Sequence, residues 1–454
     1  MSLSTTITIA GLGYGSRAAR TFSVQSALDA AQVIMLRTAV HPGIEDLKSD
    51  PRVVACDDLY ETSVSFDSVY GLLVDRVVSA AMTSDVLYAV PGSAVFGERT
   101  IAPIRERAKG LGIAVEIMPA VSALEPVAIA TGLDLLGDQI QIIDAMWLSE
   151  RVRMEPFSGG QLQLDPFRPL IVGQIYDQTI AGDVKHALSR LYGDDYSVSI
   201  VRNAGILGEE VVTLAHIYEI DRIGVDHLTT LVVPAVEWPS PARSPATLHQ
   251  LIAHLRSPEG CPWDRKQTFA SLRDKVLEEA HETIEAIDSK DADALAGELG
   301  DLLLVAALLA QIADEAGEFE IEDVYHQVNA KLFRRHPHVF GDTVAESAED
   351  VLATWKSVKA SERGDLPGSS SVRLRFDELP ATMSVVDRIR LSEVPSTGHT
   401  PLADQSFGEE LLSMINKAHS AGIDPERSLE AAYRISKLGD NLDVKGPAQN
   451  ETRA

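Results

Sequence analysis

Cysteine and basic residues are scarce in this sequence. Cys56 and Cys261 are the only cysteines in 454 residues, which is too few for a disulfide framework or a cysteine-rich zinc site and is typical of a reducing cytosol. Lysine and arginine total 40 against 67 aspartates and glutamates, a formal net charge of −27. Nucleic-acid binding needs a basic surface, so this balance excludes a general nucleic-acid binder. A small polyanion such as a nucleotide stays compatible where a metal ion supplies positive charge.

Targeting and membrane segments are also lacking. The N-terminus, MSLSTTITIA, has neither a basic stretch nor a long apolar core, and so differs from a signal peptide. The most apolar run, residues 299–313, is interrupted by Asp301 and Gln311 and is expected to be too short to span a bilayer. The length and the 45% hydrophobic composition predict a soluble cytoplasmic protein of two to four domains, with no nucleic-acid and no membrane partner.

Residues 1–238 show the pattern of an α/β domain. Short β-type runs alternate with helical patterns, which indicates a largely parallel sheet followed by a second α/β half. The expected strands are 6–10, 33–36, 53–54, 86–90, 114–118 and 140–143, and then 169–172, 197–201 and 227–233.

A glycine-rich turn, Gly11-Leu-Gly-Tyr-Gly15, follows the first expected strand. Such glycines let a nucleotide-type ligand approach the backbone, but they also serve simply to close a tight strand-to-helix turn. A nicotinamide site would need a third glycine two residues further on and an acid at the end of the second strand, where this chain has Leu36-Arg37-Thr38. The pattern therefore disfavours a nicotinamide cofactor.

Five segments of this domain, taken in order, resemble the tetrapyrrole (corrin/porphyrin) methylase family: ITIAGLGYG, VIMLRTAVHPGI, VLYAVPGSAVFGE, VEIMPAVSALEPVAIATGLD and QIIDA. The resemblance covers about residues 5–235 and implies a two-lobed α/β fold that binds S-adenosylmethionine between its lobes. The residues implied to touch this cofactor are Gly11, Gly13, Pro91, Gly92, Ser93, Val121, Ser122 and Ala123.

Two positions depart from the family pattern. Tyr14 and Ala120 stand where the family has proline and glycine, and each adds a side chain at a point of expected close approach. The acidic residue that usually follows the first loop is also missing, since Ser16-Arg17-Ala18 occupy that stretch. The domain is therefore interpreted either as an S-adenosylmethionine-dependent methyltransferase or as a retained scaffold that dimerises or binds a regulator.

Residues 239–247 form a proline-rich linker, and residues 248–342 are predicted to be helical. Helices are expected over 248–255, from the N-cap Thr268 to about 287, over 292–316 and over 321–333. Pro337 is expected to stop the last of these helices.

Four acidic residues stand out on these helices. Glu279 and Glu282 are three residues apart on one helix, and Glu298 and Asp301 repeat this spacing on the next. Residues at i and i+3 share one helix face, so each pair projects together. The second pair interrupts an apolar stretch, where a carboxylate is costly to bury unless a cation meets it. Four converging carboxylates would make an oxygen-rich site suited to Mg²⁺, with a merely solvated acidic face as the alternative.

This arrangement resembles the MazG family of nucleoside triphosphate pyrophosphohydrolases. The family motif, E-x-x-E, a spacer and E-x-x-D, is matched by the four acids, and the segments CPWD, ELGDLLL and KLFRRHPHVFG flank it. The resemblance implies an all-α bundle, a homodimer or higher homo-oligomer, and Mg²⁺-dependent hydrolysis of nucleoside triphosphates to monophosphate and pyrophosphate. Mg²⁺ held by the four acids would neutralise and position the triphosphate and lower the pKa of the attacking water.

Other residues are assigned supporting roles. Glu278 or Glu285 is the candidate to orient or deprotonate the water, with a solvated position as the alternative, and Glu282 is assigned a catalytic as well as a metal-binding role. Trp263 is expected to stack on the base or, equally, to pack in the core or an interface. Arginine and lysine side chains suit phosphate oxygens. The basic residues expected to bind them are Lys275, Lys331, Arg334 and Arg335.

Residues 343–440 are expected to form a helical extension. Residues 351–363 resemble a W-x-x-I-K-x-x-E segment that follows the hydrolase core in the family, and residues 407–425 resemble the latter part of a degenerate second hydrolase copy. The first acidic pair of that copy is absent and Ser406 replaces the glutamate of the second, so we expect it to pack or dimerise without binding metal. Residues 441–454 are predicted to be disordered.

The sequence therefore predicts a Mg²⁺-dependent nucleoside triphosphate pyrophosphohydrolase behind a tetrapyrrole-methylase-like domain. Two alternatives stay open: methyl transfer from S-adenosylmethionine by the N-terminal domain, and a regulatory module with an inactive hydrolase. The complete set of four acids argues against the inactive hydrolase.

Overall fold

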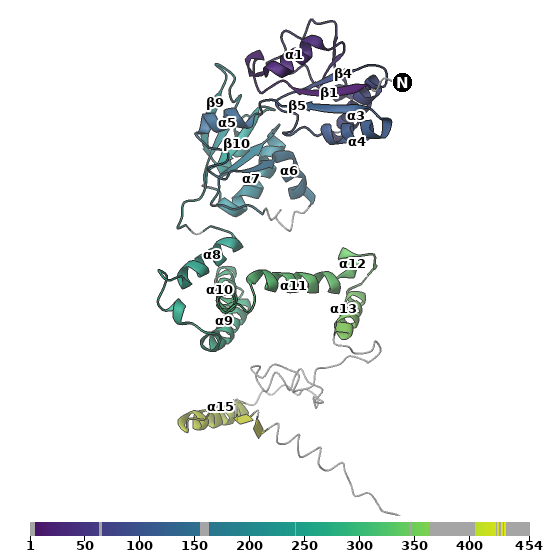
Figure 1. Cartoon of the computed structure of the whole chain (residues 1–454). Coiled ribbons are helices and arrows are strands. Elements are labelled where there is room, and N and C mark those ends of the chain that lie inside the picture. Colours follow the sequence, from purple (N-terminus) through teal and green to yellow (C-terminus); the bar gives the residue numbers. More distant parts are fainter. Residues whose placement is uncertain are drawn as a thin grey trace, which may run out of the picture. The chain divides into compact units, whose positions relative to one another are not determined.

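The computed structural model describes residues 5–62, 66–154, 163–240, 242–345, 347–362 and 405–423, together with 425, 428–429 and 431–432. The chain forms two compact units, residues 1–321 and residues 322–454. Figure 1 labels the helices and strands of both. The predicted disordered tail, residues 441–454, lies outside the described residues.

The first lobe is a five-stranded parallel sheet in the order β3-β2-β4-β1-β5. Successive side chains of β1 pack on opposite faces of the sheet: Ile7 and Ile9 pack with the helices α3 and α4, while Ala10 packs with α1 on the other face (Figure 1). A parallel strand covered on both faces has this pattern. The elements are β1 (Thr6–Gly11), η1 (Arg17–Ala19), α1 (Phe22–Ala30), β2 (Ile34–Leu36), β3 (Val53–Ala55), α2 (Asp58–Thr62), α3 (Phe66–Ala81), β4 (Val86–Val90), α4 (Ile101–Leu111) and β5 (Ala114–Met118).

The second lobe is a mixed sheet in the order β6-β7-β10-β8-β9. Only the pair β6 and β7 is parallel, so the expectation of a largely parallel sheet holds for the first lobe and not for this one. Helices α6 and α7 pack on one face, and α5 packs on the other. The elements are α5 (Leu124–Thr131), β6 (Gln141–Asp144), α6 (Ala145–Met154), β7 (Leu170–Gly173), α7 (Gln178–Tyr192), β8 (Ser197–Arg202), β9 (Val211–His216), η2 (Ile217–Arg222) and β10 (Thr229–Val233).

Strand β9 was absent from the sequence prediction. It lies at the sheet edge and pairs with β8 alone. Val211, Val212 and Leu214 are exposed there, and Ala215 is its buried residue. Such a strand has no row of buried apolar residues, so it lacks the alternation from which strands are predicted.

Three helices follow the two lobes in the first unit: α8 (Pro245–Arg256), α9 (Phe269–Ser289) and α10 (Ala292–Ala316), with the short η3 (Asp264–Lys266) between α8 and α9. Pro245 occupies the first turn of α8, so this helix begins inside the predicted linker, at a position where proline is favoured. Ile252 of α8, Leu272 of α9 and Leu308 of α10 form the core of the three helices.

The ends of α9 and α10 follow their capping residues. The Thr268 side chain accepts from the Ser271 N–H at 3.2 Å, and the Ser271 hydroxyl accepts from the Thr268 N–H at 2.9 Å, which confirms the predicted N-cap. Lys290, in the left-handed region at φ 58°, ends α9, and Asp291 then caps α10. A tight helical hairpin results.

Helix α10 is long and apolar enough to cross a membrane by length and composition, and it is the one such helix among the described residues. It has 25 residues, more than the run of 299–313 on which the sequence expectation rested. Val305, Leu308 and Ala313 are buried, because α10 packs against α8 and α9. This packing accounts for part of its apolar composition, while Leu299, Leu303 and Leu304 are 38–61% exposed.

The described helices toward the C-terminus are α11 (Ile321–Arg335), α12 (Pro337–Phe340), α13 (Ala348–Glu362) and α15 (Gln405–Ser420). Pro337 ends α11, as predicted, but it also begins α12, which the sequence did not predict. Helix α13 starts at Ala348 because Ser347 and Asp350 cap each other through reciprocal hydrogen bonds. Helix α15 covers the helix expected in the degenerate second copy; the metal-free role of that copy stays a prediction.

Candidate functional site

Three of the four predicted metal ligands come together on the α9–α10 hairpin. One carboxylate oxygen from each of Glu279, Glu282 and Glu298 lies within 4.8 Å of the others. Glu279 and Glu298 are partly buried, and Glu282 is exposed. Mg²⁺ takes oxygen ligands, carboxylates among them, at roughly 2.0–2.1 Å. The donor set therefore fits Mg²⁺.

Asp301 is not a member of this group of three, but it is electrostatically coupled to it. Burial raises the pKa of Glu279, and the charges of Glu282, Asp301 and Glu278 raise it further, against an opposing effect of Lys275. A raised pKa is the result expected when like charges face one another without a cation between them. Negative charge is thus concentrated around Glu279 and is only partly offset by Lys275.

Glu278, the candidate base, already has a cationic partner. Lys275 Nζ lies 2.6 Å from its carboxylate, and both side chains are about half exposed. This contact raises the pKa of Lys275. Phosphate oxygens would compete with Glu278 for Lys275, so binding of a polyanion would release the Glu278 carboxylate. Glu285, the other candidate base, is exposed on α9.

Trp263 is 60% exposed in the loop between α8 and α9. Arg256, at the end of α8, holds this loop by donating hydrogen bonds to the carbonyls of Asp264 and Gln267. The same guanidinium pairs with Glu315 at 2.6 Å, and the Arg256 side chain is only 7% exposed. The loop is therefore anchored to the C-terminal end of α10.

This anchor lies at the end of α10 remote from the carboxylate cluster. Glu298 and Glu315 are separated by about 26 Å along an α-helix at ~1.5 Å per residue. The loop that carries Trp263 is thus fixed far along the hairpin from Glu298. Sequence reasoning gave no signal for this, because Arg256 and Glu315 belong to helices distant in sequence.

Three of the predicted phosphate ligands, Lys331, Arg334 and Arg335, lie on α11. The Arg335 guanidinium sits over the ring of Trp355 on α13, 5.4 Å from its centroid. A cation–π contact of this kind orients the guanidinium plane. Trp355 was not assigned a role from the sequence.

Gly11, Gly13 and Gly92 join two loops of the first lobe. Gly13 N–H donates to the Gly92 carbonyl at 3.0 Å, and Gly92 N–H donates to the Gly13 carbonyl at 2.8 Å. Gly13 has φ +80°, and a Cβ at Gly11 or Gly13 would overlap neighbouring backbone. Close packing of the two loops thus requires glycine at positions 11 and 13, and contact of these residues with a cofactor stays a prediction.

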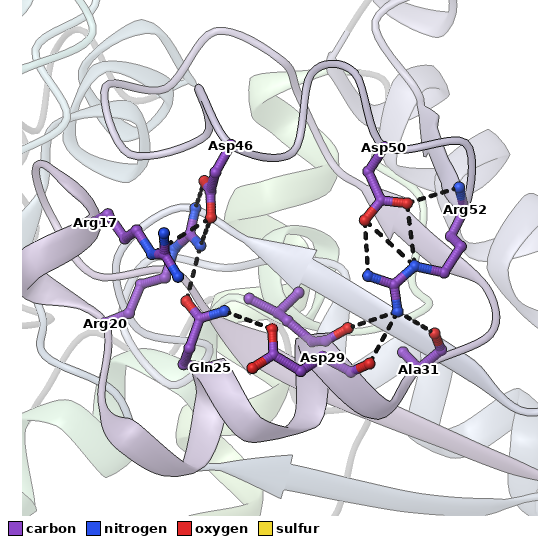
Figure 2. A network of polar contacts seen from close by, with 9 residues as sticks. Arg17, Arg20, Gln25, Asp29, Ala31, Asp46, Asp50 and Arg52 are labelled. Carbon is purple, nitrogen blue, oxygen red and sulfur yellow. Dashed lines mark hydrogen bonds and ion pairs between the residues drawn. The ribbon is translucent and has the colours of Figure 1, made fainter.

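A polar network links α1 to the segments before and after it, as Figure 2 shows. Arg20 pairs with Asp46 at 2.7 and 2.8 Å and donates to the Gly43 carbonyl. Arg52 pairs with Asp50 at 2.7 Å and donates to carbonyls at the end of α1, where a cation stabilises the exposed C=O groups (Figure 2). The network fixes the segments on either side of α1.

A cavity of about 440 Å³ lies between the two lobes. Of the residues predicted to bind a cofactor, Pro91, Gly92, Ser93 and Ala123 line it. Gly11, Gly13, Val121 and Ser122 are not among its lining residues. Ser122 is instead used locally, since its hydroxyl accepts from the Leu124 N–H and donates to Glu125 at the start of α5.

A buried ion pair lies in the wall of this cavity. Arg37 is 2.9 Å from Glu98, whose side chain is 1% exposed, and the Arg37 Nε donates to the Tyr60 hydroxyl at 3.1 Å. Burial opposes the charge of Arg37, but Glu98 and the surrounding tyrosines outweigh it, so the pKa of Arg37 is raised. This pair could not be predicted from the sequence, because Arg37 follows the second strand and its partner Glu98 is 61 residues away.

Two family models match separate parts of the chain. The MazG nucleotide pyrophosphohydrolase domain matches residues 267–340, and Tetrapyrrole (Corrin/Porphyrin) Methylases match residues 6–220. A solved structure, uroporphyrin-III-C-methyltransferase from Thermus thermophilus, gives a TM-score of 0.38 at 18% identity, covering 51% of this chain and 92% of that one.

Two relatives are informative. The uncharacterized protein YabN of Bacillus subtilis is 32% identical over 459 residues, which cover 93% of this chain and 90% of that protein. The nucleoside triphosphate pyrophosphohydrolase/pyrophosphatase MazG of Thermotoga maritima is 38% identical over 208 residues, covering 41% of this chain and 80% of that protein. The chain therefore belongs to the MazG nucleotide pyrophosphohydrolase family and carries, ahead of the MazG domain, a domain of the tetrapyrrole methylase type.

Proposed function

We propose that this protein hydrolyses nucleoside triphosphates to nucleoside monophosphate and pyrophosphate with the help of Mg²⁺. The observation that carries the proposal is the convergence of Glu279, Glu282 and Glu298 within 4.8 Å on one helical hairpin. Membership of the MazG family supports it, since the relative from Thermotoga maritima is named for this activity.

Glu279, Glu282 and Glu298 would hold Mg²⁺, with Asp301 as a fourth ligand. When bound, Mg²⁺ supplies the positive charge that lets a triphosphate approach so acidic a site. The Lys275 ammonium then moves from Glu278 to a phosphate oxygen. The Glu278 carboxylate, freed of its partner, accepts a proton from the attacking water.

Product analysis tests this proposal. Purified protein with Mg²⁺ and a panel of canonical and modified nucleoside triphosphates should release monophosphate and pyrophosphate in equal amounts. Glu298→Gln and Asp301→Asn should each lower the rate at least 10–100-fold, roughly the effect of disturbing a metal's outer shell. Asp288→Asn, an exposed carboxylate on the same hairpin, is the matched control.

The outcomes separate the alternatives. Full activity in Glu298→Gln would refute the site assignment, and release of orthophosphate in place of pyrophosphate would refute the reaction. An inactive hydrolase would show no turnover in wild type and no change of thermal stability with Mg²⁺.

We further propose that copies of the chain associate as a homodimer or higher oligomer. Four large apolar side chains on α9 and α10 support this, because they are 45–61% exposed and extended exposed apolar patches mark association surfaces. They are Ile284, Ile287, Leu299 and Leu303. We place the protein in the cytoplasm because it has few cysteines, and the absence of nucleic-acid and membrane partners stays a prediction from charge and composition.

A second candidate function is S-adenosylmethionine binding between the lobes. The cavity of about 440 Å³, lined by Pro91, Gly92 and Ser93, favours it. Small-molecule sites range over roughly 300–1,000 Å³. Titration calorimetry on the full chain tests this function, and no heat of binding at high micromolar cofactor would refute it.

A further inference from the structure

We propose that Tyr14 sets the size of the inter-lobe cavity, and that the acidic balance of its lining restricts it to a compact ligand without net negative charge. A polycarboxylate tetrapyrrole would then be excluded, although the domain is of the tetrapyrrole methylase type. The proposal rests on the second candidate function, ligand binding between the lobes, and deepens it.

Tyr14 belongs to the first lobe, and its side chain contacts the second lobe. It follows the Gly11–Gly13 turn of the first lobe and lines the cavity. Its ring lies against Gly205 of the second lobe, where a Cβ would overlap the ring and Pro126. Gly205 has φ +73°, a region that also favours glycine. The ring thus packs where Gly205 has no side chain, and it forms part of the cavity wall.

The charged residues of the lining favour a cation over an anion. They comprise one base, Arg37, and two acids, Glu98 and Asp57. Glu98 neutralises Arg37 at 2.9 Å. Asp57 accepts hydrogen bonds from the Thr38 hydroxyl and the Ala39 N–H, both at 2.7 Å. With histidines neutral, the charges of the lining sum to −1.

The size of the cavity and the charge of its lining both disfavour a polycarboxylate tetrapyrrole. About 440 Å³ is near the lower end of the range of small-molecule sites, roughly 300–1,000 Å³. A uroporphyrin-type macrocycle carries carboxylates around its whole rim, and a buried carboxylate needs a cationic partner. Arg37 is the only lysine or arginine in the lining, and Glu98 already pairs with it.

Three probes test the proposal on the full chain. S-adenosylmethionine and its analogue with a benzyl group in place of the sulfonium methyl have equal charge and unequal size. Uroporphyrin III, followed by its fluorescence, reports on the polyanionic macrocycle. Nile red, an uncharged dye, reports on the cavity without either ligand.

The variants are Tyr14→Ala, Tyr14→Phe and, as a control outside the lining, Tyr218→Ala. Wild type should bind S-adenosylmethionine with much higher affinity than the benzyl analogue, and it should not bind uroporphyrin at tens of micromolar concentration. Tyr14→Ala should bring the affinity for the benzyl analogue closer to that for S-adenosylmethionine, because the cavity is larger. It should also raise Nile red emission. Tyr14→Phe, which keeps the ring, should behave as wild type, and Tyr218→Ala measures dye bound elsewhere.

Two results would overturn the proposal: uroporphyrin binding by wild type, or Nile red emission in Tyr14→Ala no higher than in Tyr218→Ala. If S-adenosylmethionine does not bind, the second candidate function fails. The dye and the porphyrin still decide the role of Tyr14 and of the lining charge in that case.

Discussion

His41 illustrates how burial fixes the protonation state of a single residue. Its Nδ1 accepts from the Gly43 N–H at 3.0 Å, so Nε2 carries the proton and donates to the Gly13 carbonyl, also at 3.0 Å. Burial lowers the pKa of His41, Arg20 adds to this, and the bond to Gly13 opposes it. A second proton on Nδ1 would face the Gly43 N–H, so the ring is held neutral.

The first lobe should therefore lose stability as pH falls below about 6.5, the usual pKa of histidine. Below that pH the unfolded chain takes up a proton that folded His41 does not, so the free energy of unfolding decreases. Urea unfolding at about pH 7.5 and 5.5 measures this. The loss should be smaller in His41→Gln, which does not titrate, and equal losses would exclude a contribution from His41.

Repulsion among the hairpin carboxylates leads to a prediction for metal removal. The raised pKa of Glu279 means that its charged form is destabilised in the folded chain when no cation is present. Chelator-treated protein should gain thermal stability on addition of Mg²⁺. Glu279→Gln should melt above wild type without metal and should respond weakly to Mg²⁺.

Differential scanning fluorimetry over a Mg²⁺ titration makes this comparison. Asp288→Asn serves again as control, because it removes one acid from α9 outside the cluster. If Mg²⁺ raised the melting temperature of Glu279→Gln as much as that of wild type, Glu279 would not be a metal ligand.

Helix α9 depends on its first turn. Thr268 and Ser271 satisfy each other's backbone N–H groups, and these N–H groups have no partner within the helix. Thr268→Ala should lower the free energy of unfolding of this region by about 1 kcal/mol, within a range of roughly 0.5–2 kcal/mol for N-caps. Thr268→Ser keeps the hydroxyl and should lose little. Urea unfolding followed by far-UV circular dichroism measures both, and equal stability of Ala and Ser variants would refute the cap.

The loop between α8 and α9 depends on Arg256. Its bonds to Asp264, Gln267 and Glu315 are charge-assisted, and each such bond contributes roughly 1.5–3 kcal/mol. Arg256→Leu should therefore accelerate amide hydrogen exchange over residues 257–267 by at least about tenfold. Arg273→Leu, on the exposed side of α9, is the control. Unchanged exchange in Arg256→Leu would show that the loop is held by other contacts.

Elements with local signals could be predicted from the sequence, and elements without them could not. Helices α9 and α10 begin at Thr268 and Asp291, whose side chains cap them, so their bounds follow from local chemistry. Strand β9 has no alternating buried face and was missed. The antiparallel pairing of β8 and β10 depends on how the chain connects the strands, and the amino-acid composition of a strand says little about the direction of its neighbour.

At the scale of the whole molecule, the same distinction separates the two candidate sites. The acids of the hairpin were predictable because helical spacing places them together. The cavity was not, since Tyr14 meets Gly205 and Arg37 meets Glu98 only after the lobes have folded. Ser93 was predicted from a motif and does line the cavity, whereas the hydroxyl of Ser122 is used to begin α5.

A single charge introduced among the exposed apolar side chains of α9 and α10 tests whether copies of the chain associate through this face. Leu303 is 61% exposed on α10, so Leu303→Glu should fold normally in a single chain but prevent the face from being buried. Sedimentation velocity should show an oligomer for wild type and a monomer for Leu303→Glu. Leu136→Glu, at a leucine of the second lobe that is 86% exposed, is the control, and a monomeric wild type would refute the association.

The reciprocal hydrogen bonds between Gly13 and Gly92 have a consequence for how a ligand would enter the cavity. They hold the first loop against the Pro91–Ser93 loop before any ligand arrives, so binding need not order either loop. Preorganisation of this kind removes a conformational entropy penalty. A ligand should then associate in a single kinetic phase, at a rate that rises linearly with its concentration and without a slow closure step.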